Sequence, residues 1–200
     1  MRRRLGGEQK KRSVFMIAGE HRCQNASGRP PVSFNCVLYA PRSSNSSSAA
    51  MSTSLHVTPV RSDDDWAKAR AIRKQVFIEE QDCPPEEEWD ELDDTSRHVL
   101  GWINGEAVAT ARWRTVPYDE EIVAKLERFA VLPDYRGQGH GTRLVHQVLD
   151  DARRAGFDTF LVHAQSRLRD WYESLGFTSI GRTFEEVGIP HVEMVRREGD

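Results

Sequence analysis

Regular spacing of apolar residues begins only after residue 50 of the 200-residue chain. Residues 1–50 sustain neither the period of two that marks a strand nor the period of 3.6 that marks a helix, and they end in the polar run 43–48. A segment with so little apolar surface cannot offset the entropy that is lost on ordering. We therefore expect a single folded domain over 51–200, preceded by a disordered N-terminal extension over 1–50.

The first part of the domain is predicted to form a strand, a helix and an acidic segment. Residues 55–60 have strand character, and Asp63 is predicted to cap a helix that ends at 79–81. One face of this helix carries, at helical spacing, Trp66, Ala69, Arg73, Val76 and Phe77. The acidic stretch 84–91 is predicted to be a loop or a short helix.

Strand and turn signals mark the middle of the domain. Residues 97–103 and 106–114 flank Asn104-Gly105, a dipeptide that favours a two-residue hairpin turn, so an antiparallel hairpin is predicted. A third strand is predicted over 125–131. It ends before Pro133 because proline cannot donate to a strand ladder.

Helices alternate with strands in the last part of the domain. The helix that follows Gly141 has apolar residues at helical spacing and ends before Gly156. A buried strand over 159–164, a helix capped by Ser166, and a hairpin of 177–184 with 190–195 follow. This order predicts an α/β fold with a mixed (α+β) sheet and flanking helices.

Charge is divided unevenly between the two parts of the chain. Residues 1–50 carry a net charge of +7, and residues 51–200 carry −10. An acidic domain repels phosphate backbones, so a nucleic-acid partner is disfavoured. No stretch approaches the ~18 apolar residues that a membrane helix requires, so no membrane partner is expected. We expect a soluble, cytoplasmic domain.

The basic extension is open to two interpretations. It is rich in Arg and Ser and poor in acid, as organellar transit peptides are, whereas the change of pattern at 51–53 fits a translation start assigned too far upstream. We favour the second. Of the three cysteines, only Cys83 lies in the domain, so neither a disulfide framework nor a spaced metal site is predicted there.

A glycine-rich loop, 136–141, lies between the third strand and the following helix. Backbone N–H groups and the helix dipole converge at such a junction, so it is suited to bind phosphate. A Walker loop requires a Lys before Ser or Thr, but Thr142 follows Gly141 directly. A dinucleotide fingerprint requires a third glycine at the position of Thr142. Both nucleotide motifs are therefore excluded.

The pattern that does fit is Arg-x-x-Gly-x-Gly, placed after a strand that ends in Phe129-Ala130-Val131. Together with the element order and the ending Tyr-x-x-x-Gly-Phe at 172–177, it resembles the GNAT superfamily of N-acetyltransferases over residues 55–196. Within that family it looks most like the bacterial ElaA and YjcF branch. The segments that support this are 76–81, 164–165, 171–177 and 188–194, with Asp90, Asp93 and His98.

The resemblance implies a site for acetyl-CoA, used as a co-substrate, and it implies no metal. In the family, backbone amides of the loop hold the pyrophosphate, pantetheine pairs with the exposed strand edge, and the amide of Val131 faces the thioester carbonyl. The implied coenzyme-binding residues are Phe129, Ala130, Val131, Arg136, Gly137, Gln138, Gly139, His140, Gly141, Thr142 and Gln165.

Tyr172 aligns with the family's frequent general acid, although its setting also fits core packing. For the base that deprotonates the amine, Glu127 is a candidate, with a structural ion pair as its alternative role. The segments peculiar to the branch place four candidates in the acceptor pocket, where surface or hydrogen-bonding roles are the alternative: Glu80, Asp93, His98 and His191.

These observations predict an N-acetyltransferase that moves the acetyl group of acetyl-CoA to an amine by direct attack in a ternary complex. The acceptor is either a small molecule or a protein lysine, and the acidic charge favours a cationic one. Two alternatives stay open: a non-catalytic acyl-CoA sensor, and a transferase that uses a longer acyl-CoA. A homodimer is also left open.

Overall fold

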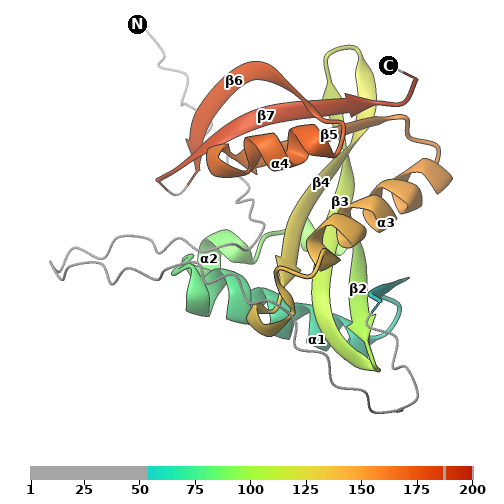
Figure 1. Ribbon diagram of the computed structural model, residues 1–200, viewed down its shortest axis with the longest axis vertical. Coiled ribbons are helices and arrows are strands. Elements are labelled where there is room, and N and C mark those ends of the chain that lie inside the picture. Colours follow the sequence, from blue (N-terminus) through green and yellow to red (C-terminus); the bar gives the residue numbers. More distant parts are fainter. Residues whose placement is uncertain (1–53, 187, 200) are drawn as a thin grey trace, which may run out of the picture.

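One mixed sheet of seven strands forms the centre of the part described by the computed structural model, residues 54–186 and 188–199 (Figure 1). The predictions made for residues 1–50 lie outside this part. The strand order is β1-β2-β3-β4-β5-β7-β6, and only β4 and β5 run parallel. The strands are β1 (His56–Pro59), β2 (Arg97–Ile103), β3 (Glu106–Tyr118), β4 (Glu121–Val131), β5 (Thr159–Gln165), β6 (Thr178–Glu186) and β7 (Ile189–Arg197).

Helices cover both faces of the sheet (Figure 1). On β4, Phe129 and Val131 pack in the core that includes α3 (His140–Arg154), whereas Ala130 between them packs against residues of α1 (Asp63–Arg73). This alternation assigns α1 and α3 to opposite faces. The prediction of a mixed sheet with flanking helices is thereby confirmed. The remaining elements are η1 (Lys74–Glu80), α2 (Pro85–Glu88), η2 (Asp93–Thr95), η3 (Pro133–Tyr135), η4 (Ser166–Leu168) and α4 (Arg169–Ser174).

Two helix starts differ from the prediction. Ser62, in extended conformation, accepts a hydrogen bond from the Asp65 amide at 3.1 Å, so Ser62 and not Asp63 caps α1. Asp63 lies instead in the first turn, where its charge complements the helix dipole. Ser166 begins the 3-10 turn η4, and α4 follows only after Leu168. Helix α1 also continues into η1, a seven-residue π-helix that apolar periodicity does not predict.

The hairpin of β3 and β4 extends well beyond the predicted strands. It pairs as far as Tyr118 with Glu121, and it contains Pro117. The pairing of β3 with β2 ends at Trp113, so beyond that point one side of β3 has no neighbouring strand. A proline is tolerated on such an edge. The predicted strand ended at Arg114, four residues before the observed end of β3.

The feature that positions the site is the separation of β4 from β5. These two parallel strands pair only at Ala124 with Phe160 and at Lys125 with Leu161. Farther along β4, the register against β3 shifts, so that Arg128 and Phe129 together oppose Ala111, and Arg128 has a φ of +57°. Such a bulge bends and twists the strand that carries it. Beyond Lys125, β4 therefore has an edge without a strand partner.

Leu126→Ala is expected to destabilise the fold by about 2–5 kcal/mol, because Leu126 on β4 is fully buried in the main core. Chemical denaturation measures this loss. Ile122→Ala on the same strand is the control, since that side chain is 60% exposed, and its effect is expected to stay within about 0.5 kcal/mol. Equal losses in the two variants would contradict the burial of Leu126 in the core and the exposure of Ile122.

Candidate functional site

The loop between β4 and α3 presents unpaired backbone amides. Gly137 and Gly139 have φ values of +73° and +80°, which other residues rarely adopt, and a Cβ at either would meet no atom within 4 Å. Helix α3 then begins at His140 without a side-chain cap. Among the described residues, no protein acceptor is recorded for the amides of Gly137 through Thr142. Free amides at a helix start are suited to hold a phosphate group.

A cavity of about 480 Å³ adjoins this loop. Four of the residues predicted to bind the coenzyme line it: Gln138, Gly139, His140 and Thr142. The other lining residues come from the start of the described chain and from the exposed side of α3: Ser54, Leu55, Arg143, His146 and Gln147. The loop is thus open on its outer side.

The backbone of Val131 points toward the side of the sheet where β5 lies. The next amide, that of Leu132, donates to the Val108 carbonyl of β3 at 2.9 Å. Successive residues of a strand direct their backbone groups to alternate sides. The N–H and C=O of Val131 therefore point away from β3. The carbonyl accepts from Arg136 Nε at 2.8 Å, and the edge beside the amide is the one that β5 leaves unpaired.

Two buried side chains, one at the end of β5 and one on α4, have polar atoms without a partner in the described part of the chain: Gln165 Nε2 and the Tyr172 hydroxyl. Gln165 ends β5, and its Oε1 accepts from Arg167 Nε at 2.8 Å. Tyr172 is fully buried on α4, which lies close to the loop, because a Cβ at Gly141 would be 3.9 Å from Trp171. Burial raises the pKa of Tyr172 well above its usual value.

Arg136 and Glu80 form a bidentate ion pair. The two carboxylate oxygens of Glu80 accept from the terminal guanidinium nitrogens of Arg136 at 2.7 and 2.6 Å. The sequence assigned Arg136 to the coenzyme and Glu80 to the acceptor. The structure brings the two residues together at the start of the loop, with both side chains partly buried.

A largely buried ion-pair network lies between α1, α2, η2 and the strands β3 and β4. Arg112 of β3 donates to Asp90 at 2.7 Å, to Asp93 at 2.6 Å and to Glu127 at 3.0 Å. Arg73 donates to Asp93 at 2.7 Å. The network includes Arg73, Glu88, Asp90, Asp93, Arg112, Glu127 and Arg128.

Glu127 is held as a carboxylate by three cations. Its oxygens lie 2.9 Å from Arg112, 3.1 Å from Arg114 and 3.2 Å from Lys125, and the side chain is fully buried. Burial raises the pKa of Glu127, but these positive charges outweigh burial and hold the pKa well below its usual range. A carboxylate held in this way has little tendency to take up a proton. The geometry therefore favours the ion-pair role over that of a general base.

The two histidine candidates lie on different parts of the sheet. His98 of β2 has Nε2 3.0 Å from the Asp93 carbonyl, and burial is the main cause that lowers its pKa. His191 of β7 pairs in register with Gln165, and its Nδ1 donates to the Ile189 carbonyl at 2.8 Å. Of the four predicted acceptor residues, Asp93 and His98 thus lie together, while Glu80 and His191 lie elsewhere.

Sequence reasoning did not select the buried arginines as site residues. Arg73, Arg112 and Arg128 are each at most 1% exposed. One signal was available, because Arg73 occupies the apolar face of its helix. Arg112 and Arg128 lie on strands, where a charge in an apolar run usually indicates the exposed face. No local sequence signal therefore indicated that these two arginines are buried.

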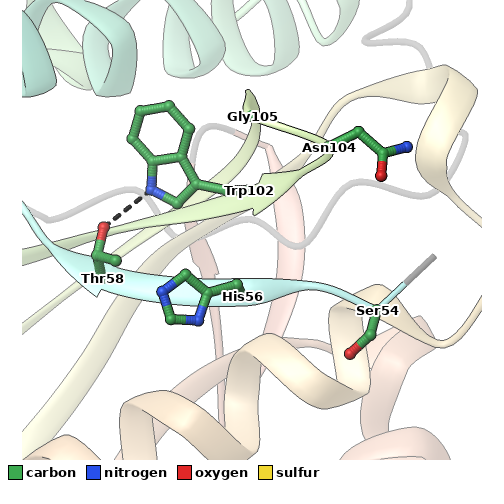
Figure 2. Close-up of a pocket in the computed structure, with 6 residues that line it drawn as sticks. All are labelled: Ser54, His56, Thr58, Trp102, Asn104 and Gly105. Carbon is green, nitrogen blue, oxygen red and sulfur yellow. Dashed lines mark hydrogen bonds between the residues drawn. The ribbon is translucent and has the colours of Figure 1, made fainter. Parts of the chain in front are cut away.

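A second cavity, of about 460 Å³, lies at the β1 edge of the sheet and involves none of the predicted site residues. Figure 2 shows Trp102 of β2 across it, with its indole N–H donating to the Thr58 hydroxyl at 2.8 Å. Its lining consists of Ser54, His56, Thr58, Trp102, Asn104 and Gly105.

Within residues 54–186 and 188–199, no group of three or more His, Cys, Asp or Glu side chains is arranged to hold a metal ion. No helix in the same ranges has the length and apolar character needed to cross a membrane.

Known proteins resemble this chain over most of the described region. Residues 67–198 match the Acetyltransferase (GNAT) domain family. The chain is 36% identical to protein ElaA of Escherichia coli over 127 residues, which cover 62% of this chain and 82% of ElaA. It is 30% identical to the N-acetyltransferase YjcF of Bacillus subtilis over 137 residues, which cover 68% of this chain and 95% of YjcF.

Solved structures show the same fold. The crystal structure of Escherichia coli ElaA matches with a TM-score of 0.61 at 28% identity, covering 72% of this chain and 100% of that one. A GNAT family acetyltransferase from Elizabethkingia anophelis, solved with acetyl-CoA bound, matches in fold with a TM-score of 0.50 at 15% identity, covering 72% of this chain and 97% of that one. The resemblance expected from the glycine loop and the element order is thereby confirmed. The chain belongs to the GNAT acetyltransferase family and is an acyl-CoA-dependent acyltransferase.

Proposed function

We propose that this chain transfers the acetyl group of acetyl-CoA to an amine by direct attack within a ternary complex. The observation that carries the proposal is the unpaired edge of β4. The strands β4 and β5 pair only as far as Lys125 and Leu161, and Val131 directs its amide to the side that β5 leaves. An extended pantetheine arm fits beside such an edge as an additional strand does.

The residues present suit coenzyme A in charge and in hydrogen bonding. The amides of Gly137 through Thr142 have no recorded protein acceptor within the described ranges, so they are available to a pyrophosphate. Buried donors without partners are rare in folded proteins, and here Gln165 Nε2 and the Tyr172 hydroxyl are two of them. A ligand with carbonyl and sulfur acceptors would satisfy both.

The proposed chemistry uses these donors. The amine nitrogen attacks the thioester carbonyl carbon, and the Val131 amide stabilises the negative charge that develops on the carbonyl oxygen. The new C–N bond forms as the C–S bond breaks, and the bonding electrons leave with sulfur. Tyr172 donates its hydroxyl proton to that sulfur. The proton that the amine nitrogen loses as the amide forms passes to water, and water returns a proton to Tyr172. Burial keeps Tyr172 protonated at neutral pH, as an acid must be before it acts.

We assign Glu127 to the ion-pair network and not to proton abstraction. Its three cationic neighbours stabilise the carboxylate so strongly that it is a weak base. Of the two histidine candidates for the acceptor pocket, we favour His191, because it lies in register with Gln165 at the end of β5.

The charge of the domain supports a cationic acceptor. Residues 51–200 carry a net charge of −10, which attracts polyamines, amino sugars and lysine-containing peptides toward the surface. The attraction acts at long range and does not distinguish among these amines.

The double variant Gly139→Asp, Gly141→Asp is expected to lose coenzyme A binding in calorimetric titration of the full chain. Two carboxylates would repel the pyrophosphate and fill the space in front of the loop amides. Gly181→Asp is the matched control, because Gly181 on β6 has a similar φ of +81° and open space around it. Equal binding by all three proteins would place the pyrophosphate elsewhere.

Tyr172→Phe is expected to lower kcat by about 10²-fold while the melting temperature holds or rises, because the hydroxyl that it removes has no partner in the described chain. The measurement is coenzyme A release with the fastest acceptor from a panel of polyamines, amino sugars and lysine peptides. Tyr135→Phe, which removes a hydroxyl that donates to Glu106 at 2.8 Å, serves as control. An unchanged kcat in Tyr172→Phe would refute the acid role.

Glu127→Gln is expected to destabilise the fold by about 3–5 kcal/mol at pH 7, because it leaves buried cations without their partner. The folded-state pKa of Glu127 lies below its unfolded value of about 4.3, so this stabilisation exists above that pH and is lost as pH falls below it.

Denaturation at pH 7, 5 and 3.5 would measure the gap in the free energy of unfolding between wild type and Glu127→Gln. The gap should be constant down to about pH 5 and narrow at pH 3.5. Glu121→Gln is the control, because Glu121 forms an exposed pair with Arg197 and contributes at most about 1 kcal/mol. A gap that widens as pH falls would contradict the ion-pair role.

A further inference from the structure

Glu80 ends the π-helix η1, and its contacts run toward the coenzyme loop. Both of its carboxylate oxygens accept from Arg136, at 2.7 and 2.6 Å. The side chains of Glu80 and Arg136 are 29% and 20% exposed, so water screens the pair only in part. Bidentate pairs of this kind fix the orientation of a guanidinium as well as its position.

The third nitrogen of the Arg136 guanidinium holds the strand edge. This Nε donates to the Val131 carbonyl at 2.8 Å. That carbonyl points to the side where β5 is no longer paired. Arg136 therefore donates the hydrogen bond that a strand neighbour would otherwise donate to this carbonyl. Three contacts thus join Glu80, Arg136 and Val131. In the proposed reaction, the amide of Val131 faces the thioester.

We propose that Glu80 is a positioning residue for coenzyme binding, which acts through Arg136 on the loop and on Val131. This role rests on the proposed function and differs from acceptor binding, because Arg136 already engages both oxygens of Glu80. The loop contains two glycines in left-handed conformations, and glycine gives a backbone much freedom in the absence of an anchor. Holding the amides in place before the ligand arrives lowers the entropy that binding costs.

Arg136 has a structural role in this arrangement. With Glu80 paired to its terminal nitrogens and Val131 to its Nε, Arg136 holds the geometry of the site, and the pyrophosphate is left to the amides of 137–142. If Glu80 instead competed with the pyrophosphate for Arg136, its removal would tighten coenzyme binding. The two possibilities therefore predict opposite changes in the Kd of coenzyme A when Glu80 is removed.

The test is the Kd of coenzyme A, measured by calorimetry on the full chain for Glu80→Gln. We expect the Kd to rise about tenfold, as for loss of a coupled contact. In an Arg136→Met background, Glu80→Gln should add no further weakening, because the partner through which it acts is gone. Glu79→Gln is the matched control, since Glu79 is an exposed neighbour that pairs with Lys74, and its Kd should equal that of wild type.

A Kd that is unchanged or lower in Glu80→Gln would overturn the proposal, and so would an equal tenfold rise in the Arg136→Met background. Each of these results leaves the proposed function intact, provided that wild type binds coenzyme A. Failure of wild type to bind would instead overturn the proposed function, and this role with it. A rise in the acceptor KM of Glu80→Gln with an unchanged coenzyme Kd would show that Glu80 acts in acceptor binding instead.

Discussion

The separation of β4 from β5 is the constraint on which the rest of the site depends. Parallel strands normally pair along their shared length, but here pairing stops after Lys125. The bulge at Arg128, with its positive φ, bends β4 at that point. A non-glycine residue keeps such a conformation only where its surroundings hold it. The buried contacts of Arg128 with Glu88 and Asp90 provide that hold.

The ion-pair network links the docking of the helices to the conformation of β4. Buried charges are costly to desolvate, and they persist only when they are paired with good geometry. In this chain the partners come from α1, α2, η2, β3 and β4, so the network can form only when the helices are docked on the sheet. Arg112 stands at its centre, since it reaches Asp90, Asp93 and Glu127 together. The same contacts that dock the helices thus fix the bulged strand.

Local sequence signals predicted most of the helices and strands. The features that the sequence did not predict depend on contacts between residues distant in sequence. The Asn104-Gly105 turn and the glycine loop were predictable because a few adjacent residues determine them. The π-helix η1, the insertion of β7 between β5 and β6, and the extension of β3 past Pro117 depend on tertiary packing. The motifs likewise pointed to Tyr172 and Gln165, whereas the cations around Glu127 come from two strands whose register no local pattern specifies.

The central claim is that the amides of Gly137 through Thr142 and of Val131 receive the coenzyme along the unpaired edge of β4. A crystal structure of the full chain with coenzyme A tests it most directly. The account predicts pyrophosphate oxygens within about 2.7–3.2 Å of those loop amides, and a pantetheine arm beside Val131. A pyrophosphate bound away from the loop, or β5 paired with β4 along its whole length, would contradict it.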